Sequence, residues 1–577
     1  MLQEVEARHS REAIEQEIRV FEETAGKFVR GEITDEQFRP FRLKHGTYGQ
    51  RQQGVQMLRV KIPSGILDAP QLRVLAHIAD TWSNGRGHLT TRQNVQFHFV
   101  QLEDVPAAMR LLADSGLTTR EACGNTVRNI TSCPLSGICP TETFDVTPYA
   151  LGLTRFLLRH PDFHTLPRKF KIAFSGCEDD GNCAVAGIHD IGLIARVHGS
   201  SSTAHHGFKV LVGGGLATLP TEAAVLTEFL PAEELLPTVE AILRVFDETG
   251  NRKNKLKARM KFVLRDKGIE EFKRLVAEKR KLVTTQPQVF TVDSPLAQPL
   301  VHITPLGTNG HASEGYQRWA KHNLMTQKQP GYKTAWIKLP AGTITSDQFR
   351  GLADLLENNE LPGVRIAILQ NFVIPWIPAE KARQVFDQLH SLDLATPGAR
   401  TIADVTGCPG ATTCNLGITR SLTLADVLAR EFSNESDPDI LKLKIKISGC
   451  PNSCGQHHIA DIGFYGNARK IGDHQAPFYM LMLGGEVSER GVRFAKQLMP
   501  LPAKQIPQVI RELLDLYRSH REPGEPFRNW AERTPHPEIA ARLQPLVTAA
   551  GESPDTFVDW GDIETYSLKL GRGECAT

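Results

Sequence analysis

The stretch VKIPSGILDAPQLRVLA, residues 60–76, occurs again with changes as IKLPAGTITSDQFRGLA at residues 337–353. The two copies start 277 positions apart (60 and 337), and the same offset relates Gln93 to Gln370. The order of matching residues continues beyond this stretch, and the offset drifts only slightly, to 271 by the time HDIG at 189–192 meets ADIG at 460–463. Chance similarity does not keep such order, so the chain is predicted to consist of two homologous halves.

Each half begins with a unit of about 60 residues in which strand patterns alternate with helical ones. QLRVLAHIADTW (71–82) and PAAMRLLADSGL (106–117) have helical periodicity, which predicts helices packed on one face of a small sheet. The second part of each half carries the cysteines. There KLKIKI (442–447) alternates lysine with aliphatic residues and is predicted to form a half-buried strand. The predicted class is α+β.

The repeat and the composition shifts divide the chain into seven segments. They are an N-terminal helical extension (1–45), a first α+β unit (46–118), a first cysteine-containing unit on the anion-binding side (119–276), a connector rich in Pro, Gln, Thr and Gly (277–327), a second α+β unit (328–396), a second cysteine-containing unit (397–530) and a C-terminal tail (531–577).

Composition excludes several classes of protein. The formal net charge is +2 over 577 residues, so no global field favours nucleic acid. No run of about 18 apolar residues predicts a transmembrane helix, and MLQEVEARHSREAIEQEI does not resemble a secretory signal. A cytoplasmic location is therefore expected. In that compartment the ten cysteines favour metal binding, reactive thiols or buried packing over disulfides.

Four cysteines of the second half form two close pairs, Cys408-x5-Cys414 and Cys450-x3-Cys454. Four soft thiolates in this pattern favour a cubane iron–sulfur cluster. Structural zinc remains the alternative, although its usual spacing of two to four residues fits only the second pair. The absence of any metal is the third interpretation.

The first half contains a related set. Cys133-x5-Cys139 is intact, but Cys177 is followed by Cys183 at x5 in place of x3. The sequence favours an incomplete copy whose thiols remain from the duplication, and a second cluster is the alternative.

The halves also differ in their cations. Arg59 and Arg128 of the first half align with Trp336 and Ala403, whereas the lysine pairs are present in both. Because residues i and i+2 of a strand share a face, Lys169 and Lys171 can converge on one ligand. Guanidinium and ammonium groups together suit a small oxyanion. We therefore expect one half to hold electrons and the other to hold the anion.

Several motifs resemble those of the sirohaem-dependent nitrite and sulfite reductase family, over about residues 44–529. They are TGCPGATTC (406–414), SGCPNSCGQHHIADIG (448–463), TTRQNVQFH (90–98), LPRKFK (166–171), VGGGL (212–216) and GNRKNKLKARMKF (250–262). The resemblance, of the assimilatory sulfite reductase haemoprotein type, implies two ferredoxin-like half-domains and two sirohaem/Fe–S half-domains in a pseudo-twofold arrangement.

The resemblance also implies site residues and cofactors, namely sirohaem and a [4Fe–4S] cluster. Cys454 would ligate the cluster and bridge it to the sirohaem iron. The implied sets are Cys408, Cys414, Cys450 and Cys454 for the cluster, Arg59, Arg128, Lys169 and Lys171 for the substrate, and Arg92, Gln96, Lys257, Arg259 and Lys261 for the sirohaem carboxylates.

Within the family, plant nitrite-reducing members commonly carry Asn where this chain has Lys171. The stretch KFK at 169–171 therefore favours sulfite over nitrite as the substrate. A non-catalytic electron carrier would need no anion pocket.

The sequence contains no evident flavin or nicotinamide domain, so a ferredoxin or a separate flavoprotein is the expected donor. Tyr48 and Cys123 resemble a pair that is crosslinked near the sirohaem in some members.

Other candidate ligands are interpreted more conservatively. His457 and His458 are expected to pack or form hydrogen bonds, and His98 is a possible cofactor contact. The glycines at 213–215 lack the spacing of a nucleotide-binding loop. The role of Cys575 is open.

Overall fold

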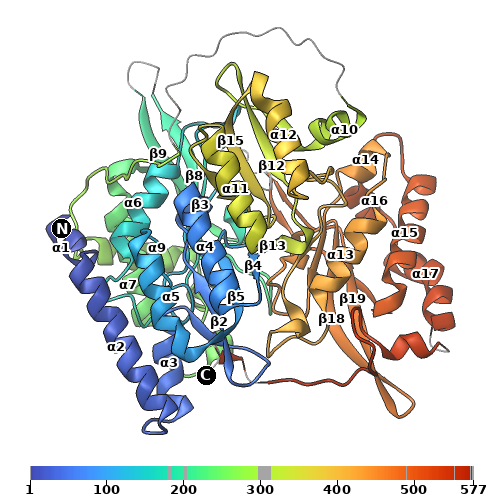
Figure 1. Ribbon diagram of the computed structural model, residues 1–577, viewed down its shortest axis with the longest axis horizontal. Helices are drawn as coiled ribbons and strands as arrows, with labels where there is room; N and C mark the ends of the chain where they lie inside the picture. Colours follow the sequence, from blue (N-terminus) through green and yellow to red (C-terminus); the bar gives the residue numbers. More distant parts are fainter. Residues whose placement is uncertain are drawn as a thin grey trace.

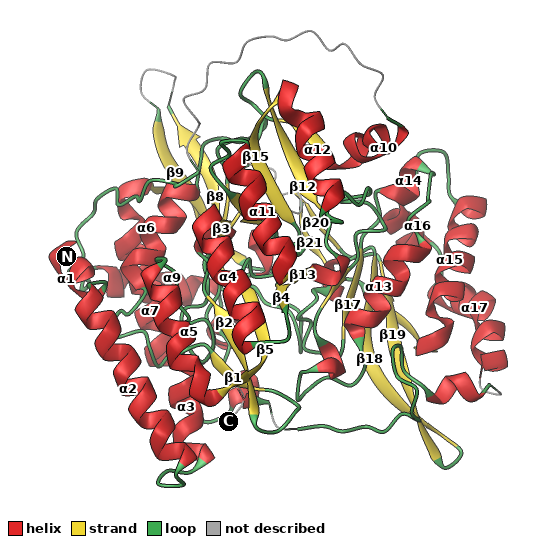
Figure 2. Ribbon diagram, in the orientation of Figure 1, coloured by secondary structure: helices red, strands yellow, loops and turns green. Residues whose placement is uncertain are grey.

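The computed structural model describes residues 2–177, 183–199, 204–296, 313–488, 490–550, 553–571 and 573–574, without the side chains of 549–550. Cys575 lies outside this part of the chain. Among the described residues, no helix is both long and apolar enough to cross a bilayer. The described part of the chain forms four five-stranded sheets and one two-stranded sheet, together with the helices that cover them (Figures 1 and 2).

The first ferredoxin-like half consists of one sheet and two helices. Its strands, in spatial order, are β1 (Thr47–Gly49), β2 (Val55–Val60), β5 (Val95–Gln101), β4 (Arg86–Leu89) and β13 (Thr343–Thr345), and its helices are α4 (Ala69–Trp82) and α5 (Val105–Asp114). The predicted helical stretches of the first half are therefore both helices. The last strand, β13, comes from the other copy of the repeat.

The second ferredoxin-like half repeats this arrangement. Its strands are β11 (Leu324–Thr326), β12 (Tyr332–Ile337), β15 (Phe372–Pro378), β14 (Val364–Ile366) and β3 (Ile66–Leu67), and its helices are α11 (Ser346–Asn358) and α12 (Ala382–Ser391). Its edge strand β3 belongs to the first copy. The two copies thus exchange one edge strand each, antiparallel in both cases.

A tight turn in the repeated stretch directs each exchanged strand to the other sheet. Gly65 and Gly342 have φ angles of +71° and +73°, a region that favours glycine. A Cβ on Gly65 would lie 2.6 Å from the carbonyl oxygen of Ile366, and one on Gly342 would lie 2.7 Å from that of Leu89. Both copies therefore keep glycine where one chain crosses closely over the other.

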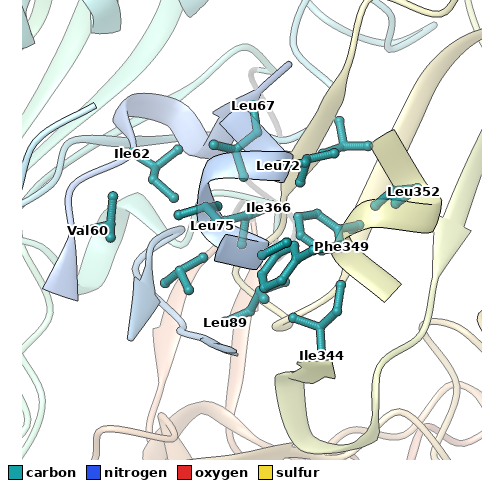
Figure 3. Close-up of a cluster of buried hydrophobic side chains, with 14 of the residues drawn as sticks. Val60, Ile62, Leu67, Leu72, Leu75, Leu89, Ile344, Phe349, Leu352 and Ile366 are labelled. Atoms are coloured by element: carbon teal, nitrogen blue, oxygen red, sulfur yellow. The ribbon is translucent and has the colours of Figure 1, made fainter. Parts of the chain in front are cut away.

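The exchange gives the two halves one hydrophobic core. Side chains of α4 and of strands β2 to β4 pack against Ile344, Phe349 and Leu352 of the second copy (Figure 3). The same core takes in Phe21 and Phe38 of the N-terminal extension, whose helices are α1 (Leu2–Arg8), α2 (Arg11–Val29) and α3 (Asp35–Lys44).

The two cysteine-bearing halves each contain a mixed sheet and a separate core. The first has strands β10 (Ala224–Pro231), β9 (His205–Val212), β8 (Ile191–His198), β7 (Ile172–Ser175) and β6 (Thr131–Ser132), with helices α6 (Thr147–Leu157), α7 (Leu235–Thr249), α8 (Met260–Lys267) and α9 (Ile269–Arg280). The short helix α10 (Glu314–Asn323) precedes β11.

The second cysteine-bearing half has the same order of strands, and a hairpin of β20 (Glu486–Ser488) and β21 (Gly491–Arg493) lies beside its sheet. The sheet strands are β16 (Thr406–Gly407), β17 (Ile445–Ser448), β18 (Ile462–Ile471), β19 (His474–Leu483) and β22 (Lys496–Pro502), and the helices are α13 (Ser421–Glu431), α14 (Pro438–Leu441), α15 (Ile506–His520), α16 (Phe527–Arg533) and α17 (His536–Ala550). The predicted α+β class and its duplication are confirmed.

One expectation about this half is wrong. Residues 442–447 were expected to form a half-buried strand, but β17 begins at Ile445 and all four of its residues are buried. The reason is that β17 lies between the parallel strands β16 and β18, where both faces of the sheet are covered. Lys446 is accommodated because its Nζ donates to Oε1 of Gln456 at 3.0 Å.

The C-terminal segment returns to the first half of the molecule (Figure 1). Tyr566 donates from its hydroxyl to the Ile418 carbonyl at 2.9 Å, and the Gly571 amide donates to the Asn415 carbonyl at 2.9 Å. At its end Glu574 accepts from Nη1 of Arg42 at 2.7 Å, and both side chains are almost fully buried. The segment therefore runs along the 415–418 loop and joins it to α3.

The shared core generates a prediction about cooperativity. Ile344→Ala is expected to lower the free energy of unfolding by about 2–5 kcal/mol, because Ile344 is fully buried and its loss leaves a cavity. Hydrogen exchange should rise in β4 of the first copy as well as in the second copy. The neighbouring Thr343→Ala, at a half-buried position, should change stability by less than about 1 kcal/mol. Increased exchange confined to residues 324–391 would contradict a common core.

The buried ion pair at the C-terminal end generates a second prediction. Glu574→Gln removes the partner of a buried guanidinium, which weakens the docking of the C-terminal segment. Limited proteolysis should then cleave residues 553–574 faster than in the unaltered protein. Glu32→Gln breaks an exposed ion pair with Arg30 and serves as the control. Equal cleavage rates in the two variants would show that the pair does not anchor the segment.

Candidate functional site

The four cysteines of the second half lie on two loops at one edge of a sheet. Cys408 directly follows β16, and Cys450 lies two residues after β17. Because β16 and β17 are parallel, both loops leave the sheet at the same edge. The two loops are in contact there, since the Gly449 amide donates to Sγ of Cys408 at 3.2 Å.

The thiols influence each other electrostatically. Burial, followed by repulsion from Cys454, raises the pKa of Cys408 to about 12. Burial also raises the pKa of Cys414 and Cys450, and Cys454 is again the next cause for both. Four thiolates in this environment need positive charge close by, which bound iron would provide.

The spacing of the thiols bears on the kind of metal. Among the described residues, no three His, Cys, Asp or Glu side chains converge closely enough to bind a single ion. Zinc requires four ligands at about 2.0–2.3 Å from one centre. The five residues between Cys408 and Cys414 exceed the two to four that are usual for a structural zinc pair, which favours a cluster of several irons.

The first cysteine loop is held by residues that the sequence did not indicate. The Arg51 amide donates to the Thr413 carbonyl at 2.8 Å, and its Nη2 donates to the Gly417 carbonyl at 2.5 Å. Gln52 donates to the Thr412 carbonyl at 2.9 Å. Arg51 ends the HGTYGQR stretch that was singled out for Tyr48, so the signal was present but attributed to another residue.

The second cysteine loop contacts the first half of the chain. Cys454 is exposed, and its carbonyl accepts from Oγ1 of Thr91 at 3.0 Å. Thr91 belongs to the predicted TTRQNVQFH motif and precedes Arg92. Burial lowers the pKa of His458, the second of the loop's histidines, to about 4, and Lys261 lies close enough to lower it further. The Cys454 loop therefore meets the basic side of the first half.

Two of the predicted anion-binding residues share an acceptor. Arg59 and Arg128 both donate to the Ala122 carbonyl, at 3.4 and 3.3 Å. Gln96 lies across β2 and β5 from Arg59, and with its amide oxygen turned toward the guanidinium it accepts from Nε at 3.1 Å. Arg59 and Arg128, which the repeat comparison singled out, therefore lie together, and Gln96, which the family resemblance singled out, lies beside Arg59.

A second basic group surrounds Asp190. Arg259 forms an ion pair with this carboxylate at 2.9 Å, and the Lys171 amide donates to it at 2.8 Å. Burial lowers the pKa of Lys171 well below its ordinary value, and the positive charges of Arg259, Arg92 and Lys169 lower it further.

Arg92 connects the two basic groups. It donates to Oγ1 of Thr131 at 3.2 Å and contacts His189. Burial lowers its pKa to about 9, and Arg128 and Arg259 both repel its charge. Positive charge is therefore concentrated and buried at this junction.

The loop of three glycines packs against the same basic side chains. A Cβ on Gly215 would lie 3.2 Å from Nη2 of Arg259 and 3.2 Å from Cδ of Lys261. Nζ of Lys261 donates to the Thr218 and Leu219 carbonyls at 2.7 Å each. The glycines thus permit close packing beside the cations. Lys257 is exposed, and no described contact joins it to this group.

Orphaned polar atoms test whether a large anionic cofactor fits here. Nε of Arg92 and both ring nitrogens of His98 are buried without a hydrogen-bond partner. Burial lowers the pKa of His98 to about 4, so its ring is neutral at neutral pH. Surplus buried cations and unsatisfied donors suit a macrocycle that carries several carboxylates. The residues present therefore fit sirohaem.

The remaining candidates have structural contacts. Nδ1 of His457 pairs with Oγ of Ser448 and Nδ1 of His458 with Oγ of Ser453, each at 2.9 Å, as expected for hydrogen-bonding residues. Tyr48 packs against the small apolar cluster that contains Cys123. Whether these two residues are crosslinked stays a prediction.

Comparisons with known proteins agree with this arrangement. The nitrite and sulphite reductase 4Fe-4S domain matches residues 123–283 and 398–545, and the nitrite/sulfite reductase ferredoxin-like half domain matches residues 48–115 and 325–392. Both family models thus match the chain twice, once in each half.

Individual relatives cover most of the chain. A sulfite reductase [ferredoxin] of Mycolicibacterium paratuberculosis is 28% identical, over 86% of this chain and 88% of that protein. An assimilatory ferredoxin-dependent nitrite reductase of Haloferax mediterranei is also 28% identical, over 93% and 92%. The solved NirA protein of Mycobacterium tuberculosis superposes with a TM-score of 0.75 and 27% identity, covering 88% and 92%.

The relatives include sulfite and nitrite reductases at the same level of identity, so they do not distinguish the two substrates. The duplicated domains, the paired cysteine loops and the buried basic junction all lead to one assignment. This chain belongs to the nitrite and sulfite reductase family, oxidoreductases that carry sirohaem and a [4Fe–4S] cluster.

Proposed function

We propose that this enzyme reduces sulfite to sulfide in a six-electron reaction. The observation that carries the proposal is Lys171, a buried amine beside Arg92, Arg259 and Lys169, whose lowered pKa would rise when an anion binds next to it and favours the charged form. Sulfite has three oxygens and up to two negative charges, whereas nitrite has two oxygens and one charge. A site with an additional ammonium favours the more highly charged anion. Reduction of nitrite to ammonia on the same scaffold is the alternative, because nitrite reductases are equally similar relatives.

Each group of residues has a proposed part in the reaction. Arg59, Arg128, Lys169 and Lys171 neutralise the substrate oxygens and stabilise the charge that develops as sulfur–oxygen bonds break. The two lysines and ordered water supply protons to oxygens that leave as water. The guanidinium groups of Arg59 and Arg128 donate to the Ala122 carbonyl, and the backbone amide of Lys171 donates to Asp190, so three of the four residues have fixed partners.

The remaining residues are proposed to bind the two cofactors. When bound, sirohaem would supply the redox chemistry for the anion and the cluster would supply single electrons. Cys408, Cys414, Cys450 and Cys454 would hold the cluster. Arg92, Gln96, Arg259 and Lys261 would bind the macrocycle. Lys257, for which the same role is expected, is exposed.

The electrons are proposed to come from a ferredoxin, because several relatives are named as ferredoxin-dependent enzymes. A separate flavoprotein is the alternative donor. Reconstitution of the purified holoenzyme with either donor, followed by the rate of sulfide release, distinguishes the two.

Steady-state kinetics of the holoenzyme test the choice of substrate. With an artificial reductant, kcat/KM for sulfite should exceed that for nitrite by about tenfold or more, equivalent to about 1.4 kcal/mol of transition-state stabilisation. A preference for nitrite by the same factor would overturn the proposal and establish the alternative.

Lys171→Asn tests the residue on which the proposal depends. It should lower kcat/KM for sulfite by about tenfold or more and change that for nitrite less, because the lost charge matters more to the more highly charged anion. Lys444→Asn is a matched control. Lys444 occupies the equivalent place in the second half, and its amide donates to Asp461 at 2.8 Å as that of Lys171 does to Asp190. If both variants keep the original sulfite-to-nitrite ratio, Lys171 does not set specificity.

A further inference from the structure

The four cysteines of the first half form one group in the folded chain. Sγ of Cys139 lies 3.9 Å from Sγ of Cys177, and the Cys133 thiol interacts directly with that of Cys183. The two pairs are also near each other, since Cys177 lies within electrostatic range of both Cys133 and Cys183. Cys133, Cys139 and Cys177 are buried and Cys183 is half-buried. Four thiols thus gather at a site to which the function described above gives no role.

This group occupies the place that is equivalent to the cysteine group of the second half. Cys133 follows β6 directly, and Cys177 lies two residues after β7, as Cys408 and Cys450 follow β16 and β17. The pairing of β6 with β7 is parallel, like that of β16 with β17. The same topology therefore brings both pairs of loops to one sheet edge.

Cys183 is also in register, although its spacing from Cys177 differs. Each of the second loops ends at a residue in the left-handed region, Val185 with φ of +49° and Gln456 with φ of +64°, followed by a 3-10 turn. Counted back from these residues, Cys183 and Cys454 each lie two positions earlier. The two additional residues of the first half fall between Cys177 and Cys183. The set is therefore complete, and the interpretation of an incomplete copy does not account for it.

The surroundings differ from those of the second half in one respect. Trp336, Val373 and Leu369 stand at the positions that are equivalent to Arg59, Gln96 and Arg92. These three apolar side chains belong, with Tyr332 and Trp376, to the same hydrophobic cluster as the first-half thiols. The second copy therefore presents apolar side chains at positions whose counterparts would bind the macrocycle and the anion, so a centre here would have neither sirohaem nor an anion site.

Two arginines provide positive charge beside the thiols. Arg365 is almost fully buried and lies within electrostatic range of Cys133, and its Nε has no hydrogen-bond partner. Arg400 lies within range of Cys183, with its guanidinium over the Trp336 ring and a buried Nε that is likewise unsatisfied. Buried cations and unsatisfied donors suit an anionic centre, and a cluster held by four thiolates carries net negative charge.

We propose that the first half binds a second iron–sulfur cluster, of the [4Fe–4S] type, through Cys133, Cys139, Cys177 and Cys183, without an adjoining macrocycle. The cluster would hold one electron at a time in apolar surroundings. Its position would be related by the pseudo-twofold axis to that of the second-half cysteines, which lie beside the basic residues around Arg92. The proposal concerns the metal content and does not depend on which anion is reduced.

Zinc binding and disulfide formation are the two alternatives for these thiols, and each predicts a different outcome. A zinc ion at these cysteines would be held by four sulfurs at about 2.3 Å, so the protein would contain zinc there in place of additional iron and labile sulfide. A Cys139–Cys177 disulfide would require the sulfurs to approach from 3.9 Å to about 2.05 Å. Equivalence with the second half favours the cluster over both.

Metal and sulfide analysis of the anaerobically purified holoenzyme tests the proposal. Two clusters and one sirohaem predict about nine irons and about eight acid-labile sulfides per sirohaem, whereas one cluster predicts about five and about four. About five irons, one equivalent of zinc, or a Cys139–Cys177 disulfide in non-reducing peptide mapping would each overturn the proposal. These counts are independent of turnover, so they stand whether sulfite or nitrite is the substrate.

A double variant assigns the additional irons to this site. Cys139→Ser with Cys177→Ser should lose about four irons and about four sulfides per sirohaem while the sirohaem absorption is retained. Thr154→Ala removes a buried hydroxyl of α6 in the same half, outside the group, and should leave the iron count unchanged. If the double variant keeps the full iron content of the unaltered enzyme, the cluster is not at these cysteines. The count on the unaltered enzyme remains decisive if the double variant fails to fold.

Discussion

The reciprocal exchange of β3 and β13 is the constraint on which the rest of the structure depends. Each copy contributes an edge strand to the other's sheet, and the chain can make that crossing only because Gly65 and Gly342 admit a backbone carbonyl within about 3 Å of where a side chain would begin. The result is a single core in which neither half is complete alone. The loops that bear cysteines in one half are thereby fixed against the basic segments of the other, and Thr91 meets the Cys454 carbonyl.

Within this frame the two copies differ in their side chains more than in their backbone. Where the first presents Arg59, Gln96 and Arg92, the second presents an indole and two aliphatic groups, so one side of the pseudo-twofold axis is cationic and its mirror is apolar. The sulfur ligands, by contrast, are present in both copies. Duplication thus preserved the means of binding a cluster on both sides and the means of binding a polyanion on one.

The sequence predicted the duplication and the α+β class, because these depend on periodicity and on a register that survives in single residues. It did not predict the strand exchange, since β3 is only two residues long and its partner lies some 300 residues away. The burial of β17 was misjudged because Lys446 looks like a solvent-facing residue until its bond to Gln456 is seen. Arg51 lies in a stretch that was singled out for Tyr48, and it acts on a backbone carbonyl, which any residue at position 417 would provide.

The register of Cys183 shows why spacing alone was a poor guide to the first-half thiols. Five residues separate Cys177 from Cys183, whereas three separate Cys450 from Cys454, and this difference alone suggests that the first-half motif has been lost. When the two loops are aligned instead at their left-handed residues, Val185 and Gln456, Cys183 and Cys454 fall at the same position. A loop can change length without moving its ends when parallel strands fix one end and a 3-10 turn fixes the other. What matters for ligation is where the sulfurs are placed, and the scaffold that places them is the same in both halves.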